Sequence, residues 1–235
     1  MFKSGTLLCA AVLATATPAL GDTITLDFET DSSGNPLLPG QVIDDEYAGY
    51  GVTITAEHPK DPSLNFAVIQ DSSNPPPGDE DQATPGYGPG NDTALGNILT
   101  VPGDGTDANN DGLIDDTESQ PYSPGAKVFI SFDSVYNNGS VTVVDDDADE
   151  VAGYIALTLA GSEVAFYDIT PLGDNSVQTI SFATDFDAIE VFLGGSGALG
   201  EVTAGTSQAV PTPSAVAGGL AGLGLLAARR RRAQA

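Results

Sequence analysis

Apolar and polar side chains alternate along much of the chain, first in Thr23–Phe28, where Ile24, Leu26 and Phe28 share one face. A period of two places one face of a strand in a core and the other in solvent. The same alternation, or a short apolar run, predicts ten further strands. They are expected at 50–56, 66–69, 97–101, 126–132, 140–144, 154–159, 163–169, 177–182, 189–193 and 199–203.

Turn-forming residues separate these strands. Residues 71–91 hold Pro75-Pro76-Pro77, Pro85-Gly86 and Gly88-Pro89-Gly90, a density that predicts a long loop. A short helical turn is expected at 41–47, and no long helical pattern occurs between residues 22 and 203. Short strands joined by turns predict an all-β domain at 22–203, an antiparallel β-sandwich of jelly-roll type.

The first 21 residues have the pattern of a secretory signal peptide. Lys3 supplies the positive start, Leu7–Ala14 the apolar run, and Ala19 and Gly21 the small residues before a cleavage point. The apolar run is too short for a membrane span. Residues 1–21 are therefore predicted to direct export and to be removed.

The opposite end has a second apolar segment. After a small-residue linker at 204–209, the run Ala215–Ala228 spans 14 residues and is followed by four arginines. A bilayer crossing needs about 20 apolar residues, and an arginine block favours the cytoplasmic side. The segment is expected to form a short apolar helix, a marginal transmembrane anchor with the body outside.

The tail at 210–235 resembles the PEP-CTERM sorting signal, in which a proline motif, a short apolar helix and an arginine cluster follow one another. Thr212 stands where the family has glutamate. The resemblance implies processing by an exosortase-type enzyme, transient anchoring in the inner membrane, and delivery to the cell envelope, the surface or an exopolysaccharide matrix. The residues that carry it are Pro211, Thr212, Pro213, Arg229, Arg230, Arg231 and Arg232.

Charge is distributed unevenly. Between residues 22 and 210, Lys60 and Lys127 stand against all 33 acidic residues. Such a surface repels nucleic acid and attracts divalent cations; solubility or salty surroundings would also explain it. The one cysteine, Cys9, lies in the leader, so no disulfide braces the body.

One acidic stretch, 107–118, matches the D-x-[DN]-x-[DN]-G-x5-E pattern of a calcium loop. Alternate residues of a tight loop point inward, and Gly112 allows its bend. Six oxygen donors are predicted to bind calcium: the Leu113 carbonyl and the side chains of Asp107, Asn109, Asp111, Asp115 and Glu118.

Proline and glycine flank this stretch at 101–105 and 120–125, where an EF-hand would have helices. The loop therefore resembles the helix-free calcium loops of thrombospondin type 3 repeats. It is expected to act as a structural clip rather than a conformational sensor. A solvated acidic loop is the alternative.

A second acidic run follows the strand predicted at 140–144. Asp145, Asp147 and Asp149 are candidate ligands of a second metal ion, because five carboxylates among residues 145–150 repel one another. A hairpin tip exposed to water is the alternative.

Motifs of catalysis are missing from the body. His58 is the only histidine, no G-x-S-x-G elbow accompanies it, and it is expected to be an ordinary loop residue. The leading hypothesis is a non-enzymatic, calcium-stabilised, exported protein. The alternatives are a calcium-dependent carbohydrate-binding module and a glycosidase using paired carboxylates. Candidate sugar-stacking residues are Tyr47, Tyr50, Tyr87, Tyr122 and Tyr136, and packing in the core or in a loop is the alternative for each.

Overall fold

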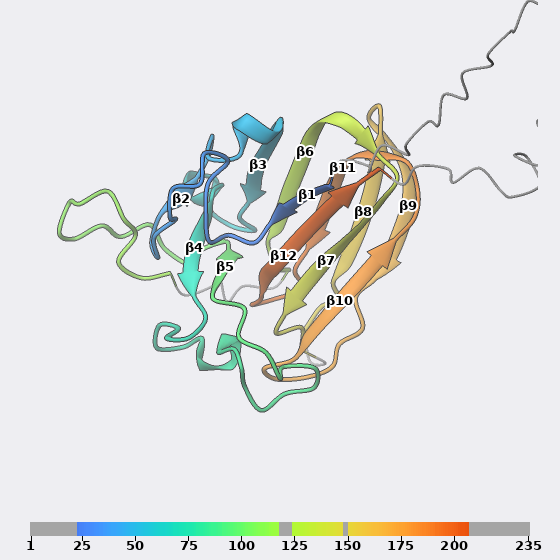
Figure 1. The fold of residues 1–235 in the computed structure, drawn as a ribbon. Coiled ribbons are helices and arrows are strands. Elements are labelled where there is room, and N and C mark those ends of the chain that lie inside the picture. Colours follow the sequence, from blue (N-terminus) through green and yellow to red (C-terminus); the bar gives the residue numbers. More distant parts are fainter. Residues whose placement is uncertain (1–22, 118–123, 148–149, 207–235) are drawn as a thin grey trace, which may run out of the picture. The chain divides into compact units, whose positions relative to one another are not determined.

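A computed structural model describes residues 23–117, 124–147 and 150–206, which belong to a compact unit spanning Asp22–Thr206 (Figure 1). The predicted signal peptide and sorting tail lie outside the described residues, as do Glu118 and Asp149. Helical structure in the described residues is limited to short 3-10 turns, none able to cross a membrane. These turns are η1 (Ala48–Tyr50), η2 (Pro62–Leu64) and η3 (Glu80–Gln82).

The described part of the chain is built from twelve strands. They are β1 (Thr23–Leu26), β2 (Val42–Ile43), β3 (Val52–Glu57), β4 (Ala67–Asp71), β5 (Asn97–Thr100), β6 (Lys127–Tyr136), β7 (Asn138–Val144), β8 (Tyr154–Leu159), β9 (Ser162–Asp168), β10 (Val177–Phe182), β11 (Phe186–Phe192) and β12 (Ala198–Gly205).

These strands form two antiparallel sheets. The seven-stranded sheet has the order β10-β7-β12-β5-β4-β2, and β1 also pairs with β12. The five-stranded sheet has the order β3-β6-β11-β8-β9. Figure 1 shows β1, β12, β7 and β10 as a layer in front of β6, β11, β8 and β9. The all-β, two-sheet prediction is confirmed, whereas the jelly-roll type stays a prediction.

One large apolar core unites the sheets. In β3, Val52, Ile54 and Ala56 are buried while the residues between them are exposed, as the alternation predicts. Their inward face joins one cluster with residues of the other sheet, such as Leu99 and Val202. Each fully buried side chain of this size contributes roughly 1.5–3 kcal/mol. Core burial therefore holds the sandwich together without a disulfide in the described residues.

Two details differ from the prediction. The prediction of a helical turn at 41–47 is wrong, because Val42 and Ile43 form β2 against β4. The helical turn comes later, at Ala48–Tyr50. Two residues are too few to show a periodicity, so only the pairing reveals β2. At the other end, β12 continues to Gly205 because it pairs with β1 and β7. Two residues of the predicted linker therefore belong to the strand.

Candidate calcium loop and adjacent groove

The predicted calcium loop lies between β5 and β6. Its first half is closed by its own backbone amides. The Asp107 carboxylate accepts hydrogen bonds from the N–H groups of Asp111 and Gly112, at 3.2 and 3.0 Å. Asn109 Oδ1 accepts one from Asp111 N–H at 2.8 Å, and Asp111 Oδ1 one from Leu113 N–H at 2.9 Å. Three predicted ligands therefore turn toward the same tight bend.

Asp115 joins this bend from the second half of the loop. Its carboxylate accepts hydrogen bonds from Ala108 N–H at 2.6 Å and from the Asn109 side-chain amide at 3.3 Å. Gly112 has a φ of 88°, and a Cβ there would meet nothing within 4 Å. The requirement for glycine is therefore conformational rather than steric.

The donor set fits a hard cation. Oxygens of Asp107, Asn109, Asp111 and Asp115 accept hydrogen bonds within one bend, and oxygens are the donors that calcium prefers. The carboxylates bond to amides here. Among the described residues, the group of three carboxylates whose oxygens lie within 4.8 Å of one another is found instead at 44–46, in a mostly exposed turn. Calcium binding at 107–118 stays a prediction.

The loop is fastened to the sandwich through Gly40. Ile114 N–H donates to the Gly40 carbonyl at 2.7 Å, and Gly40 N–H donates to the carbonyl of Ile69 in β4 at 2.8 Å. Gly40 has a φ of 87°, and a Cβ there would lie 2.5 Å from the Ile114 carbonyl oxygen. Only glycine allows this approach, so whatever orders the loop also braces the edge of the seven-stranded sheet.

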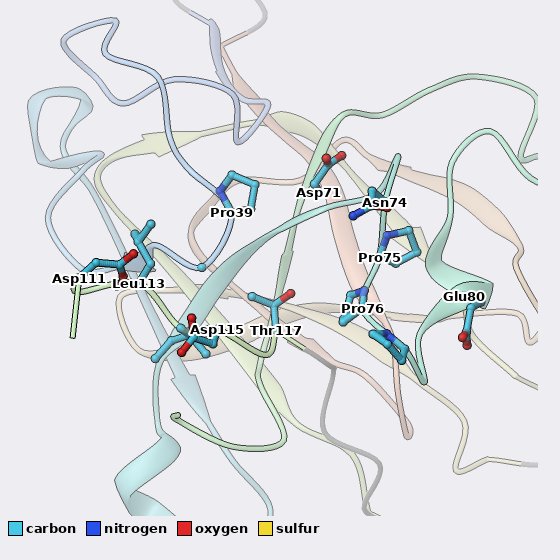
Figure 2. A pocket seen from close by; sticks show the side chains of 13 residues that line it. Pro39, Asp71, Asn74, Pro75, Pro76, Glu80, Asp111, Leu113, Asp115 and Thr117 are labelled. Atoms are coloured by element: carbon cyan, nitrogen blue, oxygen red, sulfur yellow. Dashed lines mark hydrogen bonds between the residues drawn. The ribbon is translucent and has the colours of Figure 1, made fainter. Parts of the chain in front are cut away.

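A groove of about 640 Å³ lies beside the loop. Figure 2 shows Pro75 and Glu80 on one side, with Leu113 and Asp115 across from them. None of the described residues that line it is a lysine or an arginine, which favours hydroxyl-rich or cationic ligands over anions. Its wall consists of Pro39, Gly40, Asp71, Asn74, Pro75, Pro76, Pro77, Glu80, Asp111, Leu113, Ile114, Asp115 and Thr117.

The second acidic run does not form an exposed tip. Asp145 is 1% exposed and Asp146 is 3% exposed, so the alternative of a water-solvated hairpin is wrong for these two residues. Burial raises the pKa of Asp145 to about 7 and the pKa of Asp146 to about 6. Of the three candidate ligands, Asp145 and Asp147 are described, whereas Asp149 lies outside the described residues.

The candidate sugar-stacking tyrosines divide into two groups. Tyr47 and Tyr136 belong to the core, so the packing alternative holds for these two and a sugar-stacking role does not. Tyr50 and Tyr87 are exposed, and Tyr122 lies outside the described residues.

His58 is buried. Its Nδ1 accepts hydrogen bonds from the N–H groups of Lys60 and Asp61, at 3.2 and 2.8 Å. Burial lowers the pKa of His58. The side chain therefore organises the turn that leads into η2, which supports a structural role.

An aromatic platform on the outer face of the five-stranded sheet was missed in the sequence. Tyr154 and Phe166 stack with ring centroids 4.9 Å apart, and Phe192 lies 5.1 Å from Tyr154. Beside them Lys127 pairs with Glu190 at 2.8 Å, and the Tyr154 hydroxyl donates to Glu190 at 2.7 Å. Each strand shows the alternation, but only the register between strands brings these rings together.

No protein-family model matches the chain, and no curated protein matches it. Discoidin II from Dictyostelium discoideum matches with 14% identity and a TM-score of 0.31, over 46% of this chain and 48% of that one. CBM32-3 from a family 31 glycoside hydrolase of Clostridium perfringens matches with 12% identity and a TM-score of 0.24, over 35% and 67%.

An exo-β-1,3-galactanase from Phanerochaete chrysosporium matches with 11% identity and a TM-score of 0.32, over 73% of this chain and 31% of that one. The chain spans about half the length of the discoidin II chain. All three likenesses are partial, and none says what this chain binds.

Proposed function

We propose that this chain is a non-enzymatic, exported β-sandwich that calcium stabilises at 107–118 and that the tail at 210–235 sorts to the cell envelope or extracellular matrix. The observation that carries the calcium part is the convergence of Asp107, Asn109, Asp111 and Asp115 on one bend. Because Ile114 bonds to Gly40, an ion in the loop would also stabilise the sheet edge at β4.

Thermal melts in calcium and in chelator test this proposal. At ten times its dissociation constant, an ion that binds only the folded state stabilises it by about 1.4 kcal/mol. Asp111→Asn keeps the oxygen that accepts from Leu113 N–H but removes the charge, so the part of the calcium response that comes from the loop should disappear. Coincident melts of the unsubstituted protein in calcium and chelator would contradict the proposal.

Asp104→Asn is the matched control. Asp104 is also exposed, and it accepts a backbone hydrogen bond from the residue two places on, Thr106, but it lies outside the ligand pattern. Its variant should keep the full calcium response. An equal loss in both variants would point to general charge rather than to a site.

Sorting is tested separately in cells. Deleting 210–235, or replacing Arg229–Arg232 with glutamine, should prevent delivery to the surface while leaving the folded body intact. The positive-inside preference of the arginine block is the physical basis of this expectation. Fractionation measures the outcome, and unchanged surface delivery of both variants would reject the sorting role.

The groove favours a second candidate function, calcium-dependent binding of carbohydrate such as an exopolysaccharide. Carboxylates of Asp71, Glu80 and Asp115 accept hydrogen bonds from hydroxyl groups, and the neighbouring prolines offer apolar contact. Because the loop forms one wall, calcium would order the groove.

A glycan array probed with the full chain, in calcium and in chelator, tests this second function. Calcium-dependent binding that Glu80→Gln weakens would support the groove as its site. Binding that is unaffected by both chelator and Glu80→Gln would place any sugar site elsewhere. Release of reducing sugar from a bound polysaccharide would instead favour the glycosidase alternative.

A further inference from the structure

A second set of carboxylates lies where β7 ends. Asp145 leaves the strand with a φ of 58°, and its N–H donates to the Ser176 carbonyl at 2.8 Å. Gly173 N–H donates to the Asp146 carbonyl. The chain is thus turned inward under the 173–176 segment rather than outward into solvent, which explains the burial of Asp145 and Asp146.

Oxygen atoms at this place lack partners. Asp145 Oδ1 accepts a hydrogen bond from Asn175 N–H at 2.8 Å, but Asp145 Oδ2 is buried and accepts none among the described residues. Asp146 Oδ2 and Asp81 Oδ1, the latter within η3, are also buried and accept no hydrogen bond among the described residues. Buried polar atoms are nearly always hydrogen-bonded, and an uncompensated buried carboxylate is strongly unfavourable.

These carboxylates form a buried acidic cluster, defined here as Asp81, Asp145, Asp146, Asp147 and Glu150. Asn175 joins its two parts, because Asn175 N–H donates to Asp145 Oδ1 and the Asn175 side-chain amide donates to the Asp81 carbonyl. Besides burial, the charges of Asp81, Asp147 and Glu150 raise the pKa of Asp145, and those of Glu150 and Asp147 raise the pKa of Asp146. The cluster therefore brings two separate pieces of chain together: η3 and the acidic run that follows β7.

No lysine of the described residues is among the charges that act on Asp145 or Asp146. Lys60 and Lys127 are the only lysines between residues 23 and 206, and that span has no arginine. Lys127 pairs with Glu190, and neither lysine is among the charges that act on Asp145 or Asp146. Within the described residues, the negative charge of Asp145 and Asp146 therefore has no lysine or arginine to compensate it.

We propose that the buried acidic cluster binds a divalent cation of the calcium class, with Asp81 and Asp145 as ligands from two distant segments. An all-oxygen donor set without histidine or cysteine suits a hard cation. The site is independent of the 107–118 loop, so it does not rest on the proposed function. Its consequence is a cross-link between η3 and the end of β7.

Calcium titration of the full chain, freed of metal with chelator, tests the site. Asp145→Asn keeps the oxygen that accepts from Asn175 N–H and removes the charge. In an Asp111→Asn background, which removes the loop site, the remaining calcium binding should weaken by more than about tenfold on adding Asp145→Asn. Asp92→Asn, an exposed acid outside the cluster, is the control and should change nothing. Unchanged residual binding in the Asp145→Asn protein would overturn the proposal.

Thermal melts distinguish a bound cation from protonation as the way in which the negative charge of the cluster is neutralised. With a cation site, Asp145→Asn lowers the melting temperature in calcium but not in chelator, where the lost repulsion among carboxylates offsets other effects. A carboxyl that is merely protonated would give the same shift in both buffers, and that result would reject the cation. Asp81→Asn should repeat the pattern, which guards against a folding defect particular to residue 145.

Terbium provides a spectroscopic readout. Tyr87 N–H donates to Asn175 Oδ1, and Asn175 N–H donates to Asp145 Oδ1, so Tyr87 lies near the cluster and can sensitise a terbium ion there. Tyr87→Phe should reduce the sensitised emission while leaving the amount of bound terbium unchanged. Emission that disappears in Asp111→Asn but persists in Asp145→Asn would assign the ion to the loop alone and reject the second site.

Discussion

Loop 107–117 and the buried acidic cluster are both dense in carboxylates, but they differ in the hydrogen bonds that these carboxylates accept. In the loop, each carboxylate that is predicted to bind calcium and lies in the described residues accepts backbone N–H groups a few residues away. In the cluster, oxygens of Asp145, Asp146 and Asp81 are buried without such partners. The loop can therefore fold locally before any ion arrives, whereas the cluster depends on a cation or on protons.

The carboxylate of Glu190 is stabilised in a third way, by a basic side chain. Glu190 lies on the outer sheet face with Lys127 and the Tyr154 hydroxyl as its partners. Backbone amides, a lysine and an external cation are thus three ways to stabilise negative charge in a body with only two lysines. Burial decides among them, because desolvation is smallest in the loop and largest at Asp145.

The largest effect is expected from Asn175→Ala, which acts on the cluster side. The buried Asn175 side chain accepts from the N–H groups of Tyr87 and Gly88 and donates to the carbonyls of Asp81 and Ala83. Removing it takes away the partners of the partly buried Tyr87 and Gly88 N–H groups and of the Asp81 carbonyl, at about 1–3 kcal/mol each, whereas the Ala83 carbonyl keeps its bond from Asn91. Chemical denaturation should show a loss of more than about 3 kcal/mol.

Asn110→Ala is the matched control for Asn175→Ala on the loop side. Asn110 has a φ of 59° and Asn175 a φ of 58°, so alanine meets the same backbone strain at both positions. Asn110 is exposed, and only that strain, about 1–2 kcal/mol, should be measured. Similar losses at the two positions would mean that the buried hydrogen bonds of Asn175 contribute little.

The attachment of the loop to the sheet is tested by Gly40→Ala. Both the left-handed backbone and the contact with the Ile114 carbonyl oppose a Cβ, so the loss should be about 2–4 kcal/mol. Gly34→Ala shares the left-handed φ, at 83°, but its Cβ would meet nothing within 4 Å, so about 1 kcal/mol is expected.

Calcium binding should also weaken in Gly40→Ala if the loop needs the sheet to hold its shape. Calorimetric titration measures this, with Gly34→Ala again as the reference. Equal stability losses in the two variants would show that the loop is not fastened through Gly40.

The two acidic regions also differ in how far the sequence could predict them. In the loop, partners lie within seven residues of one another, so spacing alone placed Asp107, Asn109, Asp111 and Asp115 together. Most strands could be predicted in the same way, because the alternation of apolar and polar residues within a strand indicates it without reference to its neighbours. Calcium itself stays a prediction, because spacing and amide bonding show the donors and not the ion.

The cluster depends on contacts that spacing cannot show. Asn175 reaches the Asp81 carbonyl across 94 residues, and Asp145 is buried because the 173–176 segment folds over it. A run of five acids at 145–150 therefore gave no sign of whether it faced water. The pairing of Val42 with Val68 in β2 and the stacking of Tyr154 on Phe166 were hidden for the same reason.

The smallest effect is expected from Lys127→Met, which removes the positive charge that pairs with Glu190 and keeps much of the side-chain volume. The pair with Glu190 is only partly buried, so its loss should lower stability by less than about 1 kcal/mol.

Burial acts to raise the pKa of Glu190, but hydrogen bonds from Lys127 and Tyr154 outweigh it and lower the pKa. A lowered folded-state pKa stabilises the protein above the unfolded value near 4.3 and is lost as pH falls through the folded value. In Lys127→Met the pKa of Glu190 should rise, as followed by carboxyl-carbon NMR, and the calcium response should stay unchanged. A reduced calcium response would mean that the Lys127–Glu190 pair and the acidic regions are coupled, so that the three ways of stabilising carboxylates would not be independent.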